Sequence, residues 1–312
     1  SHQIYLNGFS TSMPKFIQLS ALREIPALQN VQLIRPGYAI EYDFFPTYQL
    51  QSTLETKSIE GLYIAGQLNG TSGYEEAAAQ GLIAGANAAL KILKKDPLKL
   101  ERSTSYIGVL IDDLITKDID EPYRMFTSRA EHRLFLRADN APLRLLDIAV
   151  KSNLISTQQQ EMFLQFKSSV NKLKKLCNDN SIMVNKKKVL LSHFLKMPKN
   201  NILDPSLSSF FPKKTSPLAL FTAETDIKYE GYINIEKQRI KKIEKLNLTQ
   251  IPKNINYFNI RGLSSESCEK FSKIKPENLG QASRIAGARP SDISILAIHL
   301  EQKNKPVSRE TP

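Results

Sequence analysis

Residues 65–77, AGQLNGTSGYEEA, form the stretch that decides the fold. The short apolar segment 62–65 leads into it and has the pattern of a strand buried on both faces. Three glycines and an Asn-Gly pair then predict a tight, sterically open loop. The many small residues between 77 and 89 predict a helix that can approach a neighbouring strand or a ligand closely. The stretch therefore predicts a strand, a glycine-rich turn and a helix in succession.

The start of this helix has two interpretations. Ser72 and Glu75 have the spacing of a capping box, in which each side chain satisfies a free backbone amide. A strand, a glycine loop and a helix N-terminus also gather amides and the positive end of a helix dipole at one point, where a phosphate or an electron-rich ring is stabilised. Pure capping is favoured for Glu75. The residues alone are equally compatible with a nucleotide site and with a close-packed turn that binds nothing.

The rest of the first hundred residues alternates short apolar segments with turns. A helix is expected at 16–25, between two prolines. Strands are expected at 4–6, 31–34 and 39–42. The helix that follows the glycine loop should end near Leu93, because Pro97 disfavours its continuation. Residues 1–97 are thus expected to form one domain.

Almost every segment after residue 100 is predicted to be helical. The expected helices are 107–115, a basic helix after Pro122, 158–177 and 230–246, with a lysine-rich connection after 177 and a loop at 198–217. The end of the chain, 280–300, reads as two helices joined by a turn at Gly287, with Pro290 opening the second helix. We place the domain boundaries of this part at 98–227 and 228–312.

The net charge is concentrated downstream. The chain carries a net charge of +12, yet residues 1–100 hold eight basic and eight acidic side chains, so the whole excess lies beyond them. A polyanion such as RNA is the natural partner of such a surface. The alternative is a solvated, lysine-rich surface without a partner. No apolar run is long enough for a membrane span, which favours a cytoplasmic protein. Cys177 and Cys268 lack metal-site spacing, so no metal site is predicted.

Four arginines are the candidate RNA contacts. Arg129, Arg133 and Arg137 are four residues apart, so on a helix they would share one face, with Arg124 nearby. Guanidinium groups suit phosphate because they bind it in a bidentate manner. The structural alternative is ion pairing with the neighbouring acidic residues Glu121, Glu131 and Asp139.

The aromatic residues beside these arginines also have two possible roles. Tyr123 and Phe126 could stack on an unpaired base, although packing in the core is favoured for each.

Five motifs in one order resemble a known family. They are RPGYAIEYD at 35–43, AGQLNGTSGYEEAAAQG at 65–81, YIGVLIDDL at 106–114, EPYRMFTSRAE at 121–131 and LGQASRIAG at 279–287. Together they resemble the MnmG/GidA family, flavoproteins that modify the wobble uridine of tRNA. The resemblance implies an α/β plus all-α fold: the C-terminal part of a Rossmann-like FAD domain, followed by a mainly helical region that binds tRNA and a protein partner.

The resemblance also implies which residues bind the cofactor. Gln67 stands where the family contacts the flavin, and an amide can both donate and accept hydrogen bonds at the edge of the ring. The other implied FAD contacts are Gly66, Asn69, Gly70, Thr71, Ser72 and Gly73. The sequence has no GxGxxG fingerprint of a dinucleotide site, so we expect an N-terminally truncated fragment. The catalytic residues are unknown, since the family's catalytic cysteines have no counterpart in this chain.

The family's reaction and partners are further expectations. The resemblance implies addition of a carboxymethylaminomethyl or aminomethyl group to C5 of the uridine. It also implies NADH as reductant, a folate one-carbon unit, a homodimer, and the GTPase MnmE as partner in a heterotetramer. Two alternatives stay open. The chain could be a catalytically inert fragment that binds tRNA and the partner, or a flavoprotein with no RNA substrate.

Overall fold

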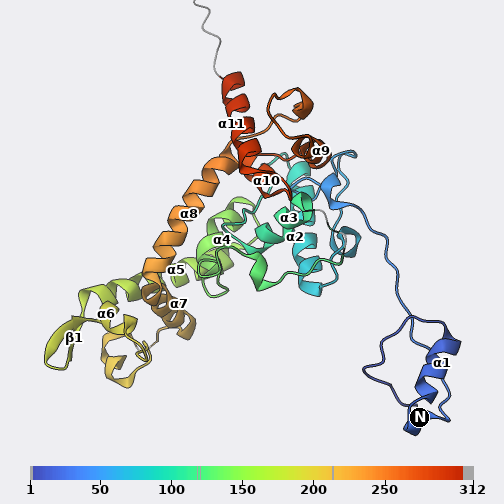
Figure 1. Cartoon of the computed structure of the whole chain (residues 1–312). Coiled ribbons are helices and arrows are strands. Elements are labelled where there is room, and N and C mark those ends of the chain that lie inside the picture. The colour runs from blue at the N-terminus through green and yellow to red at the C-terminus, as the bar shows by residue number, and fades with distance from the viewer. Residues whose placement is uncertain (1–2, 118, 120, 213, 305–312) are drawn as a thin grey trace, which may run out of the picture. The chain divides into compact units, whose positions relative to one another are not determined.

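The computed structural model describes residues 3–117, 119, 121–212 and 214–304 (Figure 1). Its contacts divide the chain into two units, Ser1–Asp43 and Phe44–Pro312. Within the described residues, no helix combines the length and the apolar composition needed to cross a bilayer.

The first unit is held together by one buried glutamine. The helix expected at 16–25 is confirmed as α1 (Lys15–Arg23), followed by the 3-10 turn η1 (Pro26–Leu28). Gln18 of α1 donates to the Gly37 carbonyl at 2.9 Å and accepts from the Gly37 amide at 2.8 Å. The side chain thereby closes the long loop that follows the helix.

The strands expected in this unit are wrong. The segments 4–6, 31–34 and 39–42 form no strand. A strand is stable only when its backbone groups are paired with a neighbour, and the described residues offer these segments none. Their apolar side chains are accordingly exposed, including Ile4, Ile34 and Ile40 at 92%, 72% and 61%.

The second unit begins with the segment that carries the glycine loop. Its elements are η2 (Thr47–Gln49), η3 (Gly66–Asn69), α2 (Tyr74–Ile92), α3 (Tyr106–Thr116), η4 (Thr127–Arg129) and α4 (Ala141–Lys151). The predicted helix after the loop is confirmed as α2, and the helix predicted at 107–115 as α3. Leu50, Leu54 and Ile64 pack against Ile83 of α2 and Ile111 of α3 to form the local core. This core fixes the base of the glycine loop.

The strand expected at 62–65 is also wrong. The segment is extended, but it pairs only through a single antiparallel bridge between Glu55 and Tyr63. The Ile64 amide donates to the Leu54 carbonyl at 3.1 Å, so the segment is held by a short turn rather than by a sheet. Its apolar character reflects burial of Ile64 in the local core and not membership of a parallel sheet.

The middle of the second unit is a small helical cluster with one hairpin. Its elements are α5 (Thr157–Asp179), β1 (Ser181–Val184), β2 (Lys187–Leu190), α6 (Leu191–Lys196), η5 (Pro205–Phe210) and α7 (Pro217–Lys228). The helix expected at 158–177 is confirmed and begins with a full capping box made by Ser156 and Gln159. The hairpin replaces the lysine-rich connection expected there. Ile182 pairs with Val189, and Ile182 packs onto the core of this cluster, which explains why the strands form.

A long helix leads from this cluster to the C-terminal bundle. Figure 1 shows α8 (Glu230–Leu248) running between them, and it contacts both α7 and α10. The bundle contains η6 (Tyr257–Asn259), α9 (Ser265–Ile274), α10 (Leu279–Arg284) and α11 (Pro290–Asn304). The predicted helix, turn and helix at 280–300 is confirmed, with Gly287 at φ +87° in the turn.

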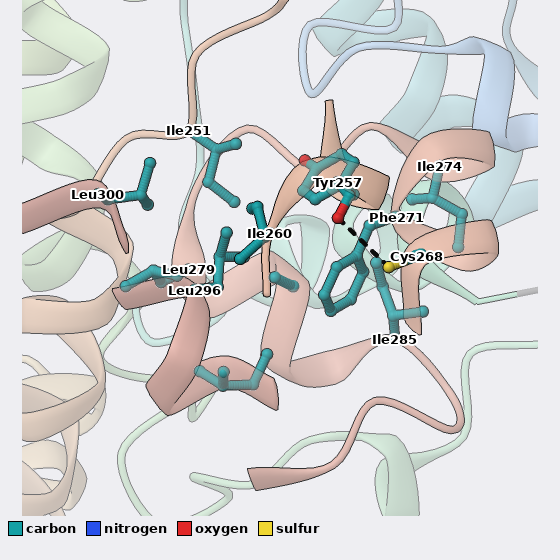
Figure 2. Packing of buried hydrophobic residues seen from close by; sticks show 12 residues of the cluster. Ile251, Tyr257, Ile260, Cys268, Phe271, Ile274, Leu279, Ile285, Leu296 and Leu300 are labelled. Atoms are coloured by element: carbon teal, nitrogen blue, oxygen red, sulfur yellow. Dashed lines mark hydrogen bonds between the residues drawn. The ribbon is translucent and has the colours of Figure 1, made fainter. Parts of the chain in front are cut away.

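The C-terminal bundle has its own apolar core (Figure 2). The rings of Tyr257 and Phe271 lie 5.4 Å apart at 60°, an edge-on packing that suits aromatic pairs. Cys268 is buried beside them and its thiol donates to the Tyr257 carbonyl at 3.3 Å. Burial raises the pKa of the Cys268 thiol, so this cysteine has the environment of a structural residue.

Candidate functional site

The glycine loop depends on backbone conformations that favour glycine. Gly66 and Gly70 lie in the left-handed region at φ +80° and +72°, on either side of Gln67. A Cβ on Gly73 would lie only 1.7 Å from a carboxylate oxygen of Glu76. The turn therefore favours glycine at 66 and 70 for its conformation, and a side chain at 73 would displace the Glu76 carboxylate.

One buried glutamine of α2 holds the loop in place. Gln80 is fully buried, and its carbonyl oxygen accepts from the Gly66 amide at 3.0 Å and from the Asn69 side chain at 2.8 Å. Its amide donates to the Thr71 hydroxyl at 2.8 Å. The Thr71 hydroxyl in turn donates to the Gly66 carbonyl at 2.9 Å. The loop is thus pinned to the helix that follows it by a buried polar network centred on Gln80.

The predicted capping box is wrong by one residue. The N-cap of α2 is Gly73, no side chain caps it, and Ser72 and Glu75 are both exposed. With the helix starting at Tyr74, the third helical position belongs to Glu76 rather than Glu75.

Glu76 turns back toward the start of its own helix. Burial raises the pKa of Glu76. Hydrogen bonds from the backbone amides of Met125 and of Glu76 itself lower this pKa and outweigh the effect of burial. The nearby Arg124 also contributes to this lowering, so the net pKa lies below the usual value. The buried carboxylate therefore stays charged while it supports the helix terminus.

The exposed rim of the loop differs from its interior. Gln67 and Ser72 are exposed, and neither side chain hydrogen-bonds to any other described residue. Asn69 and Thr71 are buried and serve the Gln80 network, although Asn69 Oδ1 is a buried acceptor that no described donor reaches. Gly70 lies against the ring of Phe44, which sequence reasoning did not single out.

This rim can bind the edge of an electron-rich ring. The first amides of α2 lack intrahelical acceptors, because every helix leaves its first N–H groups free. The exposed side chains of Gln67 and Ser72 lie close in sequence to this helix start, where the Glu76 carboxylate is the acceptor that turns back on the terminus. The residues present fit the edge of a flavin ring, because the exposed part of the loop offers several hydrogen-bond donors. The Gln80 network is buried and supports the loop from inside.

Tyr123 ties a distant segment to the loop. Its backbone amide donates to the Gly70 carbonyl at 2.7 Å, and Thr71 forms a parallel bridge with it. Its hydroxyl donates to Asp113 Oδ2 at 2.9 Å. The side chain is 4% exposed, so Tyr123 is a core residue and not a base-stacking one, whereas Phe126 is 59% exposed and does not belong to the core.

A buried charge cluster lies beneath Tyr123. Arg102 donates to Asp113 at 2.6 Å and to Glu131 at 2.6 Å, and lies 3.3 Å from Asp112. Arg284 of α10 binds Asp112 through two hydrogen bonds of 2.6 and 2.7 Å. The cluster links the C-terminal bundle to α3. Sequence reasoning missed it, although two adjacent acids within an apolar helix are a signal that partners are needed.

The basic helix expected around the arginines is wrong. Residues 121–140 contain no α-helix: they form the bridge at Tyr123, the short turn η4, further turns and bends before α4 begins at Ala141. The backbone of this segment is engaged elsewhere: the Tyr123 amide bonds to the Gly70 carbonyl, and the Arg129 carbonyl accepts from Arg102 at 3.3 Å. These long-range bonds replace helical ones, so the arginines do not share a helix face.

Two of the four arginines are structural. Arg137 is largely buried and binds Asp139 at 2.9 Å and Asp226 at 2.7 Å. Arg129 lies over the ring of Tyr123 with its guanidinium carbon 4.3 Å from the ring centroid, a cation–π contact.

The other two arginines are open to solvent. Arg124 is 54% exposed and approaches Glu76 at 3.5 Å, a weak contact. Arg133 is exposed and has no hydrogen bond or ion pair with any described side chain. Of the four, these two can reach an external phosphate without breaking an internal network. His132, between them in sequence, is buried and contacts Glu236 of α8.

Comparisons with known proteins cover both ends of the chain. The family description "Glucose inhibited division protein A" matches residues 1–96, and "tRNA modifying enzyme MnmG/GidA C-terminal helical bundle" matches residues 239–311. The tRNA uridine 5-carboxymethylaminomethyl modification enzyme MnmG of Chlorobium luteolum is 48% identical over 321 residues, which cover 96% of this chain and 52% of the relative. The enzyme of the same name from Clostridium botulinum is 46% identical over 328 residues, covering 98% of this chain and 51% of the relative.

A solved structure has the same fold. Aquifex aeolicus GidA superposes with a TM-score of 0.82 at 44% sequence identity, covering 94% of this chain and 49% of that one. This chain thus spans about half the length of the curated relatives it matches. Matches at both ends, identity above 40% along nearly the whole chain and a shared fold show that the chain belongs to the MnmG/GidA family.

Proposed function

We propose that this chain takes part in FAD-dependent modification of tRNA at C5 of the wobble uridine, adding a carboxymethylaminomethyl or aminomethyl group. The observation that carries the proposal is the loop at 65–77, in which a glutamine-pinned turn leads into a helix N-terminus and carries an exposed amide side chain. Relatives of this chain are named for modification of tRNA uridine.

The residues of the loop have distinct roles in this proposal. Gln67 and Ser72 would contact the ring edge of FAD, and the backbone around Gly66, Gly70 and Gly73 would allow the ring to approach. Asn69 and Thr71 would hold the loop's shape rather than contact the ring. Bound FAD would supply redox chemistry. The positive end of α2 would stabilise negative charge at the adjacent ring edge, and so would raise the potential of the bound cofactor.

The partners follow from family membership. We propose NADH as the reductant, a folate one-carbon unit as the donor, a homodimer, and the GTPase MnmE as the partner in a heterotetramer, all in the cytoplasm. Residues 1–97 would serve the flavin, 98–227 the tRNA, and 228–312 the protein partner. The catalytic residues are not assigned to this chain.

RNA contact falls to the exposed arginines. Arg133 is exposed without an internal partner and Arg124 has only a weak one, so both are suited to bind phosphate. Arg129 and Arg137 are held by Tyr123 and by two aspartates, so their contribution would be to shape the surface.

Two titrations of the 312-residue chain test the proposal. FAD added to the chain should show quenched fluorescence on binding, and Gln67→Ala should weaken that binding without changing stability, since Gln67 is exposed. Gln158→Ala, at an exposed glutamine of α5 remote in sequence from the loop, is the matched control. A chain that binds tRNA but no flavin would instead support the inert-fragment alternative. Flavin binding without tRNA binding would support a flavoprotein that has no RNA substrate.

A further inference from the structure

The hairpin cluster carries a concentration of positive charge that lies outside the arginine contacts proposed above for tRNA. Residues 160–200 contain nine lysines but only two acidic residues, Glu161 and Asp179. Lys172 and Lys175 are exposed in the last turns of α5, and with Lys167 they line an open stretch of that helix's surface. A protein surface ordinarily mixes charges of both signs, so a surface of one sign needs an explanation.

The hairpin places three consecutive lysines at its tip. Val184 pairs with Lys187 and Met183 with Lys188, which leaves Asn185 and Lys186 as a two-residue turn. Both turn residues are left-handed, at φ 48° and 64°, the geometry of a type I′ turn. Glycine is the preferred residue at the second position of this turn, and Lys186 occupies it instead. The chain thus accepts an unfavourable conformation in order to carry a cation at the tip.

The tip lysines differ from the neighbouring lysines in forming no ion pair with a described residue. Lys174 binds Asp226 at 2.9 Å and Lys196 binds Glu230 at 2.7 Å, so lysines of the same cluster are paired where they face the core helices. The tip lysines Lys186, Lys187 and Lys188 are exposed and have no ion pair with any described residue. Their mutual repulsion is therefore not offset within the described chain.

We propose that Lys186, Lys187 and Lys188, together with Lys172 and Lys175, form a phosphate-binding surface for tRNA, which we name the hairpin surface. The inference rests on the proposed function, because it names tRNA as the polyanion. Lysine at a phosphate acts as a point charge, and each contact releases a counterion from the RNA. Such a surface adds affinity and fixes the position of the RNA without reading its sequence.

Charge-neutral variants test the hairpin surface. The variant K186Q/K187Q/K188Q removes three charges at exposed positions and leaves the packed residues Ile182 and Val189 in place. The control K241Q/K242Q/K245Q removes three exposed charges from α8, where Glu244 lies among them. Binding of an unmodified tRNA transcript with a uridine at the wobble position is measured for the 312-residue chain by fluorescence anisotropy across a salt series, with circular dichroism to check folding.

The expected results separate the surface from general basicity. The hairpin variant should bind roughly tenfold more weakly at low salt, and its log K against log salt slope should fall by roughly 2–3, or 0.7–0.9 per lost contact. The α8 control should keep most of the slope. Equal losses in both variants, or an unchanged slope in a folded hairpin variant, would overturn the hairpin surface alone. Failure of the unmodified chain to bind tRNA would overturn the proposed function as well.

Discussion

Replacement of Gln80 by Ala should loosen the glycine loop more than any exposed change in it. Gln80 is fully buried and makes three hydrogen bonds that hold the loop, to the Gly66 amide, the Asn69 side chain and the Thr71 hydroxyl. Alanine leaves the Gly66 amide without an acceptor in a buried setting. It also removes the side-chain amide that donates a hydrogen bond to the Thr71 hydroxyl, and it leaves a small void.

The size of the effect follows from these bonds. A buried hydrogen bond contributes about 0.5–1.5 kcal/mol, and a buried donor without a partner costs about 1–3 kcal/mol. The three loop bonds together therefore place the loss in unfolding free energy at about 3 kcal/mol. With a urea slope of about 3 kcal/mol per molar, the midpoint should fall by roughly 1 M.

The assay is urea unfolding followed by circular dichroism, with Gln67→Ala as matched control. Gln67 is a glutamine of the same loop that is exposed, so its loss should change the unfolding free energy by less than about 0.5 kcal/mol. A loss below about 1 kcal/mol in Gln80→Ala, or one equal to that of Gln67→Ala, would refute the pinning role.

Three other predictions concern the charged residues. The pKa of Glu76 is lowered in the folded chain, so its ionised form stabilises the fold above the ordinary pKa of about 4.3, and this contribution is lost as pH falls through the folded pKa. The difference in unfolding free energy between the unmodified chain and Glu76→Gln, measured by urea unfolding at successive pH values, should therefore shrink in that acid range. Arg284→Ala should lower the unfolding free energy by about 2–4 kcal/mol, because Asp112 loses its bidentate partner in a buried cluster; a change within 0.5 kcal/mol would contradict that role. Arg133→Ala should leave thermal unfolding unchanged yet reduce the tRNA salt slope by about 1, whereas Arg137→Ala should lower the unfolding temperature; the opposite pattern would reverse our assignment.

Local signals in the sequence were enough to locate most helices. The glycine loop, α2, α3, α5 and the C-terminal helices follow from apolar spacing, small residues and punctuation by proline and glycine. The capping box failed by a single residue, because Glu75 and Glu76 are adjacent and both fit an N-terminal turn.

Strands and side-chain pairings were beyond such signals. The segments 31–34 and 39–42 have strand-like composition, but a strand exists only where a neighbour supplies hydrogen bonds. The helix expected for the arginine segment does not form for a related reason. The backbone amide of Tyr123 donates to the Gly70 carbonyl, about fifty positions away in sequence, and not to a carbonyl of its own segment. Gln80 follows three alanines and precedes a glycine, and nothing in that local sequence indicates its role; only the three-dimensional position of the loop does.

The contact between Ser52 and Glu277 sets the order in which parts of this chain can fold during synthesis. Both the backbone amide and the hydroxyl of Ser52 bond to the Glu277 carboxylate, at 3.0 and 3.1 Å, across 225 positions of sequence. At ribosomal rates of about 5–20 residues per second, Glu277 emerges roughly 10–45 s after Ser52. Tyr48, which packs against the C-terminal core, is without that cover for the whole interval. The segment around Ser52 therefore completes its contacts only after Glu277 has been synthesised, and its apolar surface stays open to a chaperone until then.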